Sequence, residues 1–152
     1  MFGNATELTQ LLYMDTKITL TALDQNPLFA VLTSEERIIL QRAAALNTFT
    51  KHQVLYKPGQ PAGKVFFLLQ GVVKVAVHAE KKDIIKYVVR PGNLFGESCL
   101  TGESQRRDFA YAMDDQVEAL EIDSTVLLAV RSPLRIWWSC LCCNRWHWWS
   151  PR

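Results

Sequence analysis

The spacing of apolar residues changes from helical to strand-like near residue 48. Residues 8–23 place leucines on one face of a helix, and Asn26-Pro27 ends that pattern. From about residue 48 onward, short runs of apolar and β-branched residues alternate with turn residues at intervals of about ten residues. The sequence therefore predicts helices first and a β-rich region after them.

A second helix is expected between the first helix and the strands. Thr33-Ser34-Glu35-Glu36 has the form of a capping box, in which the Thr33 hydroxyl and the Glu36 carboxylate each accept a hydrogen bond from a free backbone N–H. Ile38, Ile39 and Leu46 then continue an amphipathic pattern. We expect this helix to run through Leu46.

The β-rich region predicts about seven or eight short strands in an antiparallel arrangement. Glycine and Pro-Gly turns separate the runs, as expected for a small barrel or sandwich. A short helix is expected after Asp123, with Ser124 as its cap. The fold class is therefore mainly β with flanking helices, an antiparallel β-barrel or double-stranded jelly roll. The clearest strand segments are residues 54–56, 64–69, 72–77, 84–89, 109–113 and 116–122.

Length and composition indicate one ordinary globular domain. The 152 residues include 49% apolar and 21% charged residues, which is enough to form a core. A formal net charge of +2 does not by itself imply a nucleic-acid or membrane partner. No stretch has the form of a signal peptide or the roughly 20 apolar residues of a membrane span. These features predict a cytoplasmic protein without a membrane partner.

The last 19 residues, 134–152, differ in composition from the rest of the chain. They contain all five tryptophans and three of the four cysteines. Three interpretations compete: a zinc site, an exposed patch that binds a partner, and an aberrant terminus on an otherwise ordinary domain, which we favour. The zinc ligands would be Cys140, Cys142, Cys143 and His147, whose spacing matches no common zinc site. The chain thus divides into a helical segment (1–23), the main domain (24–133) and an atypical tail (134–152).

A stretch that begins near Leu94 carries the best candidate for a ligand site. Gly96 allows the backbone to approach a ligand closely and to present N–H groups to an anion. Glu97 can accept hydrogen bonds from sugar hydroxyls, and an arginine can bind phosphate oxygens with two parallel hydrogen bonds. These residue types suit a phosphate joined to a sugar. The candidate ligand-binding residues are Leu94, Phe95, Gly96, Glu97, Ser98, Arg106, Arg107, Asp108 and Phe109.

Three motifs in order resemble the cyclic-nucleotide-binding domain, in particular the sensor half of the catabolite-activator and fumarate–nitrate (CRP/FNR) regulators. Residues 95–97, an arginine nine or ten residues later and the strand 109–113 look like the family's phosphate-binding cassette. Residues 68–75 resemble its strand–Gly–strand signature, and residues 57–60 resemble its preceding turn. The resemblance covers roughly residues 24–130.

The resemblance implies a role for each cassette residue but leaves the arginine open. Glu97 would bind the ribose 2′-hydroxyl, Gly96 would offer its N–H, and one arginine would bind the cyclic phosphate of cAMP or cGMP. Counting residues along the cassette from one end assigns this role to Arg106, and counting from the other end assigns it to Arg107. The assignment to Arg107 places Asp108 in the usual Ser/Thr position, where its carboxylate would repel a phosphate.

Other functions remain as alternatives to nucleotide binding. The pocket could be degenerate, sense another ligand, or leave the domain as a protein-interaction or dimerisation module. A homodimer is one candidate assembly, since the family's helix after the barrel dimerises. No base-reading segment is present, so this chain alone is not expected to bind DNA.

An enzyme is the least favoured class. A cupin-type metalloenzyme needs histidines that converge from neighbouring strands. His52, His78 and His147 form no such pair, and we expect no catalytic site and no metal site.

Overall fold

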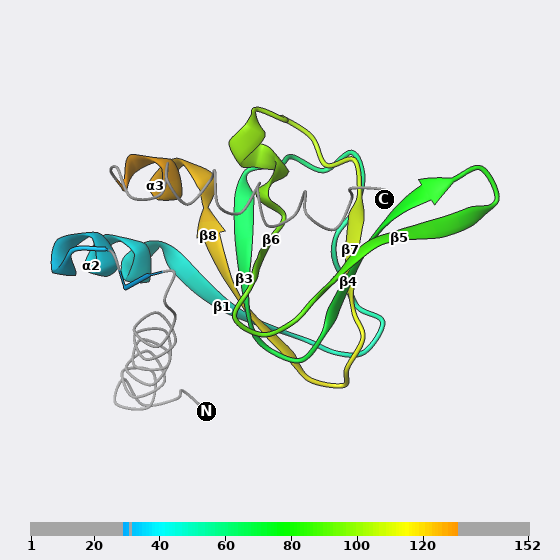
Figure 1. Cartoon of the computed structure of the whole chain (residues 1–152), viewed down its shortest axis with the longest axis horizontal. Helices are drawn as coiled ribbons and strands as arrows, with labels where there is room; N and C mark the ends of the chain where they lie inside the picture. The colour runs from blue at the N-terminus through cyan, green and yellow to red at the C-terminus, as the bar shows by residue number, and fades with distance from the viewer. Residues whose placement is uncertain (1–28, 31, 131–152) are drawn as a thin grey trace, which may run out of the picture.

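The computed structural model describes residues 29–30 and 32–130, and the predicted first helix and the Trp-rich tail lie outside these residues. Within the described part, eight strands stand between two α-helices (Figure 1). The mainly β fold with flanking helices is thus confirmed. The elements are α2 (Ser34–Ala43), β1 (Ala44–Phe49), β2 (Val54–Tyr56), β3 (Lys64–Gln70), β4 (Val73–Ala79), β5 (Lys82–Val89), β6 (Leu94–Phe95), the 3-10 helix η1 (Glu97–Thr101), β7 (Phe109–Ala112), β8 (Val117–Asp123) and α3 (Ser124–Ala129).

The strands form two four-stranded sheets that face one another. The first sheet has the order β1-β8-β3-β6 and the second the order β2-β7-β4-β5. The strand pairs within both sheets are antiparallel. Because β6 and β7 belong to different sheets, the segment between them passes from one sheet to the other. That segment contains η1 and the candidate cassette.

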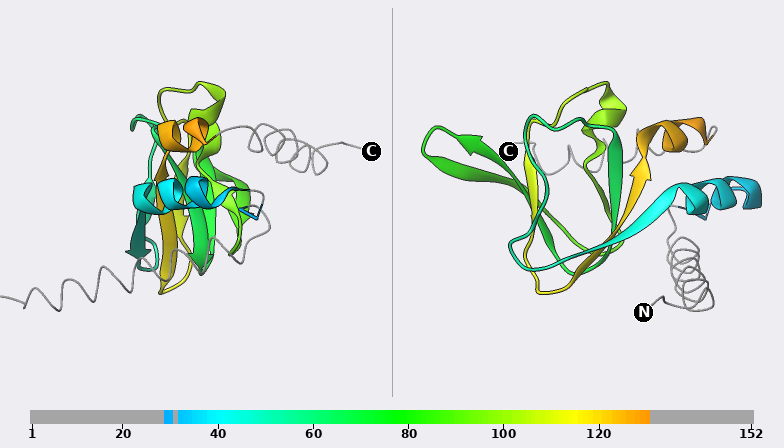
Figure 2. Two further views of the ribbon diagram at one scale, coloured as in Figure 1. Left: turned by 90° about the vertical axis from the view of Figure 1, so that its left-hand side faces the viewer. Right: turned by 180° about the vertical axis from the view of Figure 1, so that it is seen from behind.

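Strand β3, in the middle of the first sheet, is buried on both faces because it is almost continuously apolar. Along β3, Val65 and Phe67 pack with the helices, whereas Phe66 and Leu68 pack between the sheets. Residues of β8 divide between the same two clusters. Helices α2 and α3 lie side by side on the outer face of this sheet (Figure 2). The start of β3 and the start of α3 are thereby placed close to the cassette.

The predicted capping box of α2 is confirmed, but the predicted end of this helix is wrong. Thr33 is the N-cap, and its hydroxyl accepts from the backbone N–H of Glu36. The helix stops at Ala43, and Leu46 lies in β1, where it pairs with Leu120. Pairing with β8 provides a continuous hydrogen-bonded ladder and apolar cross-strand contacts, which outweigh the helix propensity of the alanine run.

The helix after β8 begins where it was predicted, but its N-cap is the residue before the expected one. Asp123, rather than Ser124, is the N-cap of α3, and its carboxylate accepts from the backbone N–H of Thr125 at 2.9 Å. Ser124 is the first residue of the helix.

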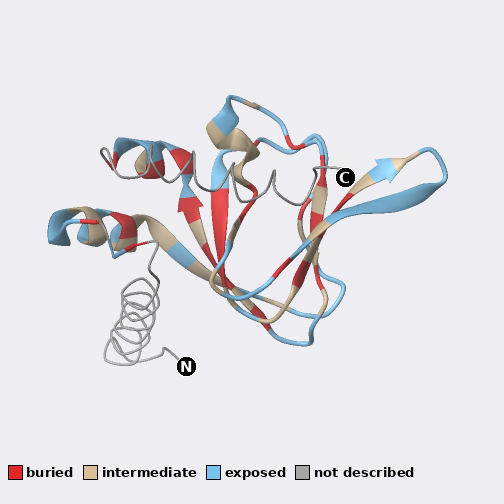
Figure 3. Cartoon of the chain, viewed as in Figure 1, coloured by how far each residue is buried: buried red, intermediate tan, exposed pale blue. Residues whose placement is uncertain are grey.

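The β4–β5 hairpin extends away from the body of the domain (Figure 1). Its outer strand is largely exposed, while buried residues concentrate in β3, β8 and the inner part of β4 (Figure 3). The core that supports the cassette is therefore formed by the two sheets and the helices, with little contribution from the tip of this hairpin.

Candidate functional site

The cassette begins with a turn at Gly96 that requires glycine. Gly96 has φ +72°, in the left-handed region, and caps the N-terminus of η1. A Cβ added at Gly96 would lie 3.1 Å from Nη1 of Arg106 and 3.1 Å from the ring of Phe66. The absence of a side chain is thus needed both for the backbone conformation and for the approach of the arginine.

The turn between β2 and β3 holds the backbone of Arg106. The backbone N–H of Arg106 donates to the carbonyl of Gln60 at 2.8 Å, and the backbone N–H of Gly59 donates to the carbonyl of Arg106 at 2.9 Å. Residues 57–60, which the sequence associated with the family's turn, therefore position the cassette arginine directly.

The Arg106 side chain is buried and is held by backbone carbonyls. Only 4% of the residue is exposed. Its Nη1 donates to the carbonyl of Gly96 at 2.5 Å, and its Nη2 donates to the carbonyl of Lys64. The guanidinium also lies over the ring of Tyr56, 4.4 Å from the ring centroid. These three contacts of the buried guanidinium are all with neutral groups, two backbone carbonyls and an aromatic ring.

Three polar atoms around Gly96 are buried. Arg106 Nε and Ser98 Oγ have no hydrogen-bond partner among the described residues, and one carboxylate oxygen of Glu97 is also shielded from solvent. Burying an N–H or a hydroxyl without a partner costs about 1–3 kcal/mol. A ligand that carries hydrogen-bond acceptors would remove this cost at Arg106 and Ser98.

The structure separates the two candidate arginines. Arg107 points to solvent, with 82% of its side chain exposed, and its Nε lies 3.5 Å from the carboxylate of Glu103. Arg106 instead lies against Gly96. The geometry therefore favours Arg106 as the group that meets a ligand at this glycine.

Asp108 is buried and forms an ion pair. Lys86 of β5 lies 2.9 Å from its Oδ2 atom. This ammonium offsets the negative charge that Asp108 brings to the cassette. The like-charge repulsion expected from the sequence is therefore reduced by a residue of β5, the edge strand of the second sheet.

Not all of the predicted site residues gather around Gly96. Leu94 packs against the core under the helices. Phe109 stacks on Tyr111 and contacts His78, on the face of β7 opposite to the buried Ala110. Phe95 lies between the sheets and stacks on Phe66. Gly96, Glu97, Ser98 and Arg106 are the residues that the structure brings together.

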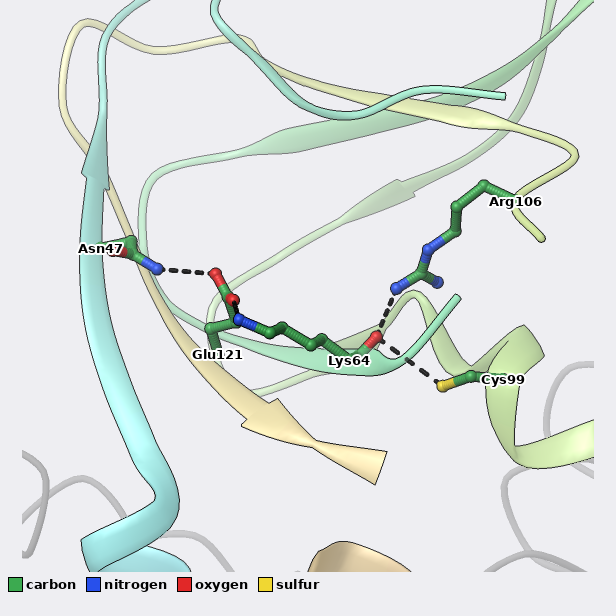
Figure 4. A network of polar contacts seen from close by, with 5 residues as sticks. All are labelled: Asn47, Lys64, Cys99, Arg106 and Glu121. Carbon is green, nitrogen blue, oxygen red and sulfur yellow. Dashed lines mark hydrogen bonds and ion pairs between the residues drawn. The ribbon is translucent and has the colours of Figure 1, made fainter. Parts of the chain in front are cut away.

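Cys99 shares its two hydrogen-bond acceptors with Arg106. Its Sγ lies 3.7 Å from the carbonyl of Lys64 (Figure 4). The same atom lies 3.6 Å from the carbonyl of Gly96. Burial raises the pKa of the Cys99 thiol, while the Arg106 charge and a hydrogen bond with Ser124 act in the opposite direction. The thiol therefore stays protonated near neutral pH.

We expect slow alkylation of Cys99 by iodoacetamide at pH 7.5, because the thiolate is the reactive form and the raised pKa makes it scarce. Peptide-resolved mass spectrometry separates Cys99 from the other three cysteines. The rate should rise with pH beyond the ordinary thiol range. A rate at pH 7.5 equal to that of the same protein in urea would contradict this prediction.

The sequence did not identify the residues that hold Arg106. In the sequence, Tyr56 and Phe66 look like ordinary core residues, but in the structure their rings lie against the Arg106 guanidinium. Lys64 holds Arg106 through its backbone carbonyl, which no sequence pattern indicates. The Lys64 side chain reaches Glu121, which also accepts from Asn47 at 2.8 Å (Figure 4). Hydrogen bonding to Glu121 and its charge raise the pKa of the Lys64 ammonium. The one sequence feature that could have indicated these residues is the alternation of the strands, which places the side chains of Tyr56 and Phe66 on the inward-facing side.

The two facing antiparallel sheets, with the cassette crossing between them at Gly96, define a ligand-binding domain of jelly-roll type. A profile of the cyclic nucleotide-binding domain matches residues 46–132. The chain belongs to this family.

Individual relatives agree with this assignment. A "Global nitrogen regulator" from a Nostoc species is 34% identical over 77 residues, which cover 49% of this chain and 34% of the relative. The sensor domain of the transcriptional regulator DNR from Pseudomonas aeruginosa superposes with a TM-score of 0.76 at 19% identity, covering 87% of this chain and 91% of that domain. The regulatory domain of Toxoplasma gondii PKA with cAMP gives 0.74 at 13% identity, covering 87% and 51%.

The match with the nitrogen regulators spans only about a third of their length, 34% for both curated relatives. The two structures mentioned, both below 25% identity, support the fold alone.

The described part of the chain contains neither a cluster of metal-binding side chains nor a membrane-spanning helix. Residues 29–30 and 32–130 contain no group of three or more His, Cys, Asp or Glu side chains that could hold a metal ion. No helix among these residues is long and apolar enough to span a membrane. His52 and His78 lie on exposed turn and strand positions, and His78 is paired with Asp83.

Proposed function

We propose that this domain is the ligand sensor of a bacterial CRP/FNR-type transcriptional regulator and that it binds cAMP or a similar cyclic nucleotide beside Gly96. The observation that carries the proposal is the buried Arg106 guanidinium beside Gly96, a glycine in the left-handed conformation; its Nε–H has no hydrogen-bond partner within residues 29–30 and 32–130. Family membership and the sensor-domain fold support the same function.

The phosphate would bind to the free edge of the guanidinium. Arginine has five N–H groups, and the two observed carbonyl contacts use one from Nη1 and one from Nη2. Nε–H and a second Nη hydrogen remain for two parallel bonds to phosphate oxygens. Ser98 Oγ is a further buried donor in the same segment. The Arg106 side chain can therefore bind an anion without leaving its carbonyl acceptors.

Glu97 would select for the sugar. It follows Gly96 directly and lies in the first turn of η1, and one of its carboxylate oxygens is buried. A carboxylate accepts hydrogen bonds from hydroxyl groups and would repel a second phosphate. This combination favours a ribose hydroxyl beside a single phosphodiester.

Calorimetric titration of the full chain with cAMP and then cGMP tests this function. We expect binding in the micromolar range, and Arg106→Lys should weaken it by on the order of tenfold or more, because lysine keeps the charge but lacks the planar fork. Arg107→Lys, at an exposed position one residue further along the chain, is the matched control and should bind like the unmodified protein.

Each outcome of this titration is informative. An equal loss in both variants would contradict the assignment of Arg106 to the phosphate. No heat with either nucleotide at millimolar concentration would overturn nucleotide binding by this chain. It would favour the alternative, a pocket that senses another ligand or a domain that acts through protein contacts.

The regulatory role and the assembly are parts of the same proposal. Because the chain matches only about a third of the nitrogen regulators, DNA binding belongs to the whole regulator and is not assigned to residues 29–130. A homodimer and a cytoplasmic location remain predictions. Light scattering over a range of protein concentrations tests the first of these.

A further inference from the structure

We propose that the ion pair between Lys86 and Asp108 makes the ligand site selective for charge and favours ligands with one negative charge. This inference rests on the proposed function and names the charge class of its ligand. Lys86 Nζ lies 2.9 Å from Oδ2 of Asp108. The pair would act through the charge that it places near Arg106, and not as a further contact to the phosphate.

Asp108 brings a buried negative charge close to the arginine. Only 8% of the residue is exposed. Asp108 follows Arg106 by two positions, so the two Cα atoms lie within about 8 Å of one another. Because the carboxylate is shielded from solvent, salt screens its effect over this distance only weakly. Without compensation, Asp108 would therefore oppose the binding of an anion at Arg106.

Lys86 reaches the cassette from the edge of the second sheet. Strand β4 lies between β5 and β7 in this sheet. The register between β4 and β5 shifts at this point, since Val75 pairs with Tyr87 whereas Ala76 pairs with Ile85. Lys86 is thus the extra residue of a β-bulge, a feature that redirects a side chain out of the regular alternation. At this position the ammonium reaches the cassette carboxylate while 45% of its side chain stays exposed.

The pair is neutral as a unit, so it adds no net charge around Arg106. Removing the charge of Lys86 leaves Asp108 negative, which should weaken the binding of an anion. Removing the charge of Asp108 leaves Lys86 positive, which should strengthen it. A pair with a purely structural role would lose affinity in both cases, because both changes break the same interaction. The direction of the two effects therefore distinguishes charge selection from a structural role.

Calorimetry with cAMP measures both effects on the full chain. At about pH 8, well above the ordinary range of a carboxyl group, we expect Lys86→Met to weaken binding about fivefold and Asp108→Asn to strengthen it about fivefold. The double variant should bind within about twofold of the unmodified protein, because it again has a neutral pair. Lys82→Met and Asp115→Asn remove the same charges at exposed positions and are the matched controls. Weaker binding in Asp108→Asn would overturn the inference.

Two further variants keep this test decisive if Lys86→Met does not fold, since removing one partner of a partly buried ion pair is destabilising. Lys86→Arg keeps the positive charge and should bind cAMP like the unmodified protein. Asp108→Asn leaves no unpaired carboxylate in the domain interior, and its stronger binding is sufficient evidence by itself. A loss of affinity in Lys86→Arg as large as that expected for Lys86→Met would contradict a role of charge.

Sulfate tests the effect of charge without a nucleotide. Sulfate carries two negative charges, so the electrostatic free energy doubles, and the gain expected in Asp108→Asn rises from about fivefold for cAMP to about twenty-fivefold. The backbone amide signal of Gly96, followed by NMR on the full chain, reports binding beside Arg106. A gain for sulfate no larger than the gain for cAMP would contradict the inference, as would the absence of a response to sulfate in Asp108→Asn.

The two proposals fail in different ways. If neither cAMP nor cGMP binds, the proposed function fails, while the sulfate titration still decides whether the Lys86–Asp108 pair determines anion affinity beside Arg106. If cAMP binds and Asp108→Asn does not strengthen its binding, the proposed function stands and the inference of charge selection is wrong.

Discussion

Replacing Gly71 with alanine is expected to lower the free energy of unfolding by about 3 kcal/mol, because the new methyl group has no space and the backbone conformation disfavours it. Gly71 has φ +82° in the turn between β3 and β4. An added Cβ would lie 2.7 Å from the backbone oxygen of Gln116 and 2.8 Å from a methyl group of Val117. Val117 is the buried first residue of β8 and Gln116 immediately precedes it, so neither can move without disturbing the core. Thermal denaturation followed by circular dichroism measures the change.

The variant Gly59→Ala distinguishes the two causes of the lower stability expected for Gly71→Ala, namely the steric contact and the backbone conformation. Gly59 has φ +86°, so alanine there meets a similar backbone penalty, but nothing lies within 4 Å of an added Cβ. We expect it to cost only about 1 kcal/mol. If Gly59→Ala and Gly71→Ala destabilise the domain equally, the contact with β8 contributes nothing and the explanation is wrong. The comparison also tests why the strand–Gly–strand motif requires glycine.

Replacing Gly96 with alanine is expected to weaken nucleotide binding by on the order of a hundredfold. The added Cβ would lie 3.1 Å from Nη1 of Arg106, at the position where this nitrogen donates to the Gly96 carbonyl. The rings of Phe66 and Tyr56 close the other sides, at 3.1 and 3.4 Å from that Cβ. The guanidinium or one of the rings must therefore give way by a few tenths of an ångström. The guanidinium is at the end of a flexible side chain, so we expect it to shift and its two parallel bonds to a phosphate to weaken. Calorimetry with cAMP measures the effect.

Gly102→Ala is the matched control at the other end of η1. Gly102 has φ +93°, and an alanine there meets open space. It should reduce stability slightly and leave nucleotide affinity within about twofold. A comparable loss of affinity in both variants would show that η1 itself, and not the displacement of Arg106, determines binding.

The local elements could be predicted from the sequence where a short-range rule fixes them. The capping box at Thr33, the glycine turns and the alternating strands are properties of neighbouring residues, and they are confirmed. The end of α2 could not be predicted in the same way. Local propensity favours a helix through Leu46, and only the distant partner strand β8, which begins at Val117, converts residues 44–49 into β1.

The location of the candidate site in the chain was also a prediction from the sequence. The order of Gly96, Glu97 and an arginine about ten residues later is a pattern in the chain itself, and it was sufficient to indicate a phosphate-binding cassette. Which arginine faces inward could not be read from it, because Arg106 and Arg107 are adjacent and equally basic.

Only the tertiary structure decides between the two arginines. The β2–β3 turn holds the backbone of Arg106, Tyr56 and Phe66 enclose its side chain, and the carbonyls of Gly96 and Lys64 accept its hydrogens. These partners come from four separate segments, and no spacing rule relates them. Sequence determines what each short segment can form, whereas burial of a charge requires partners that only the folded chain brings together.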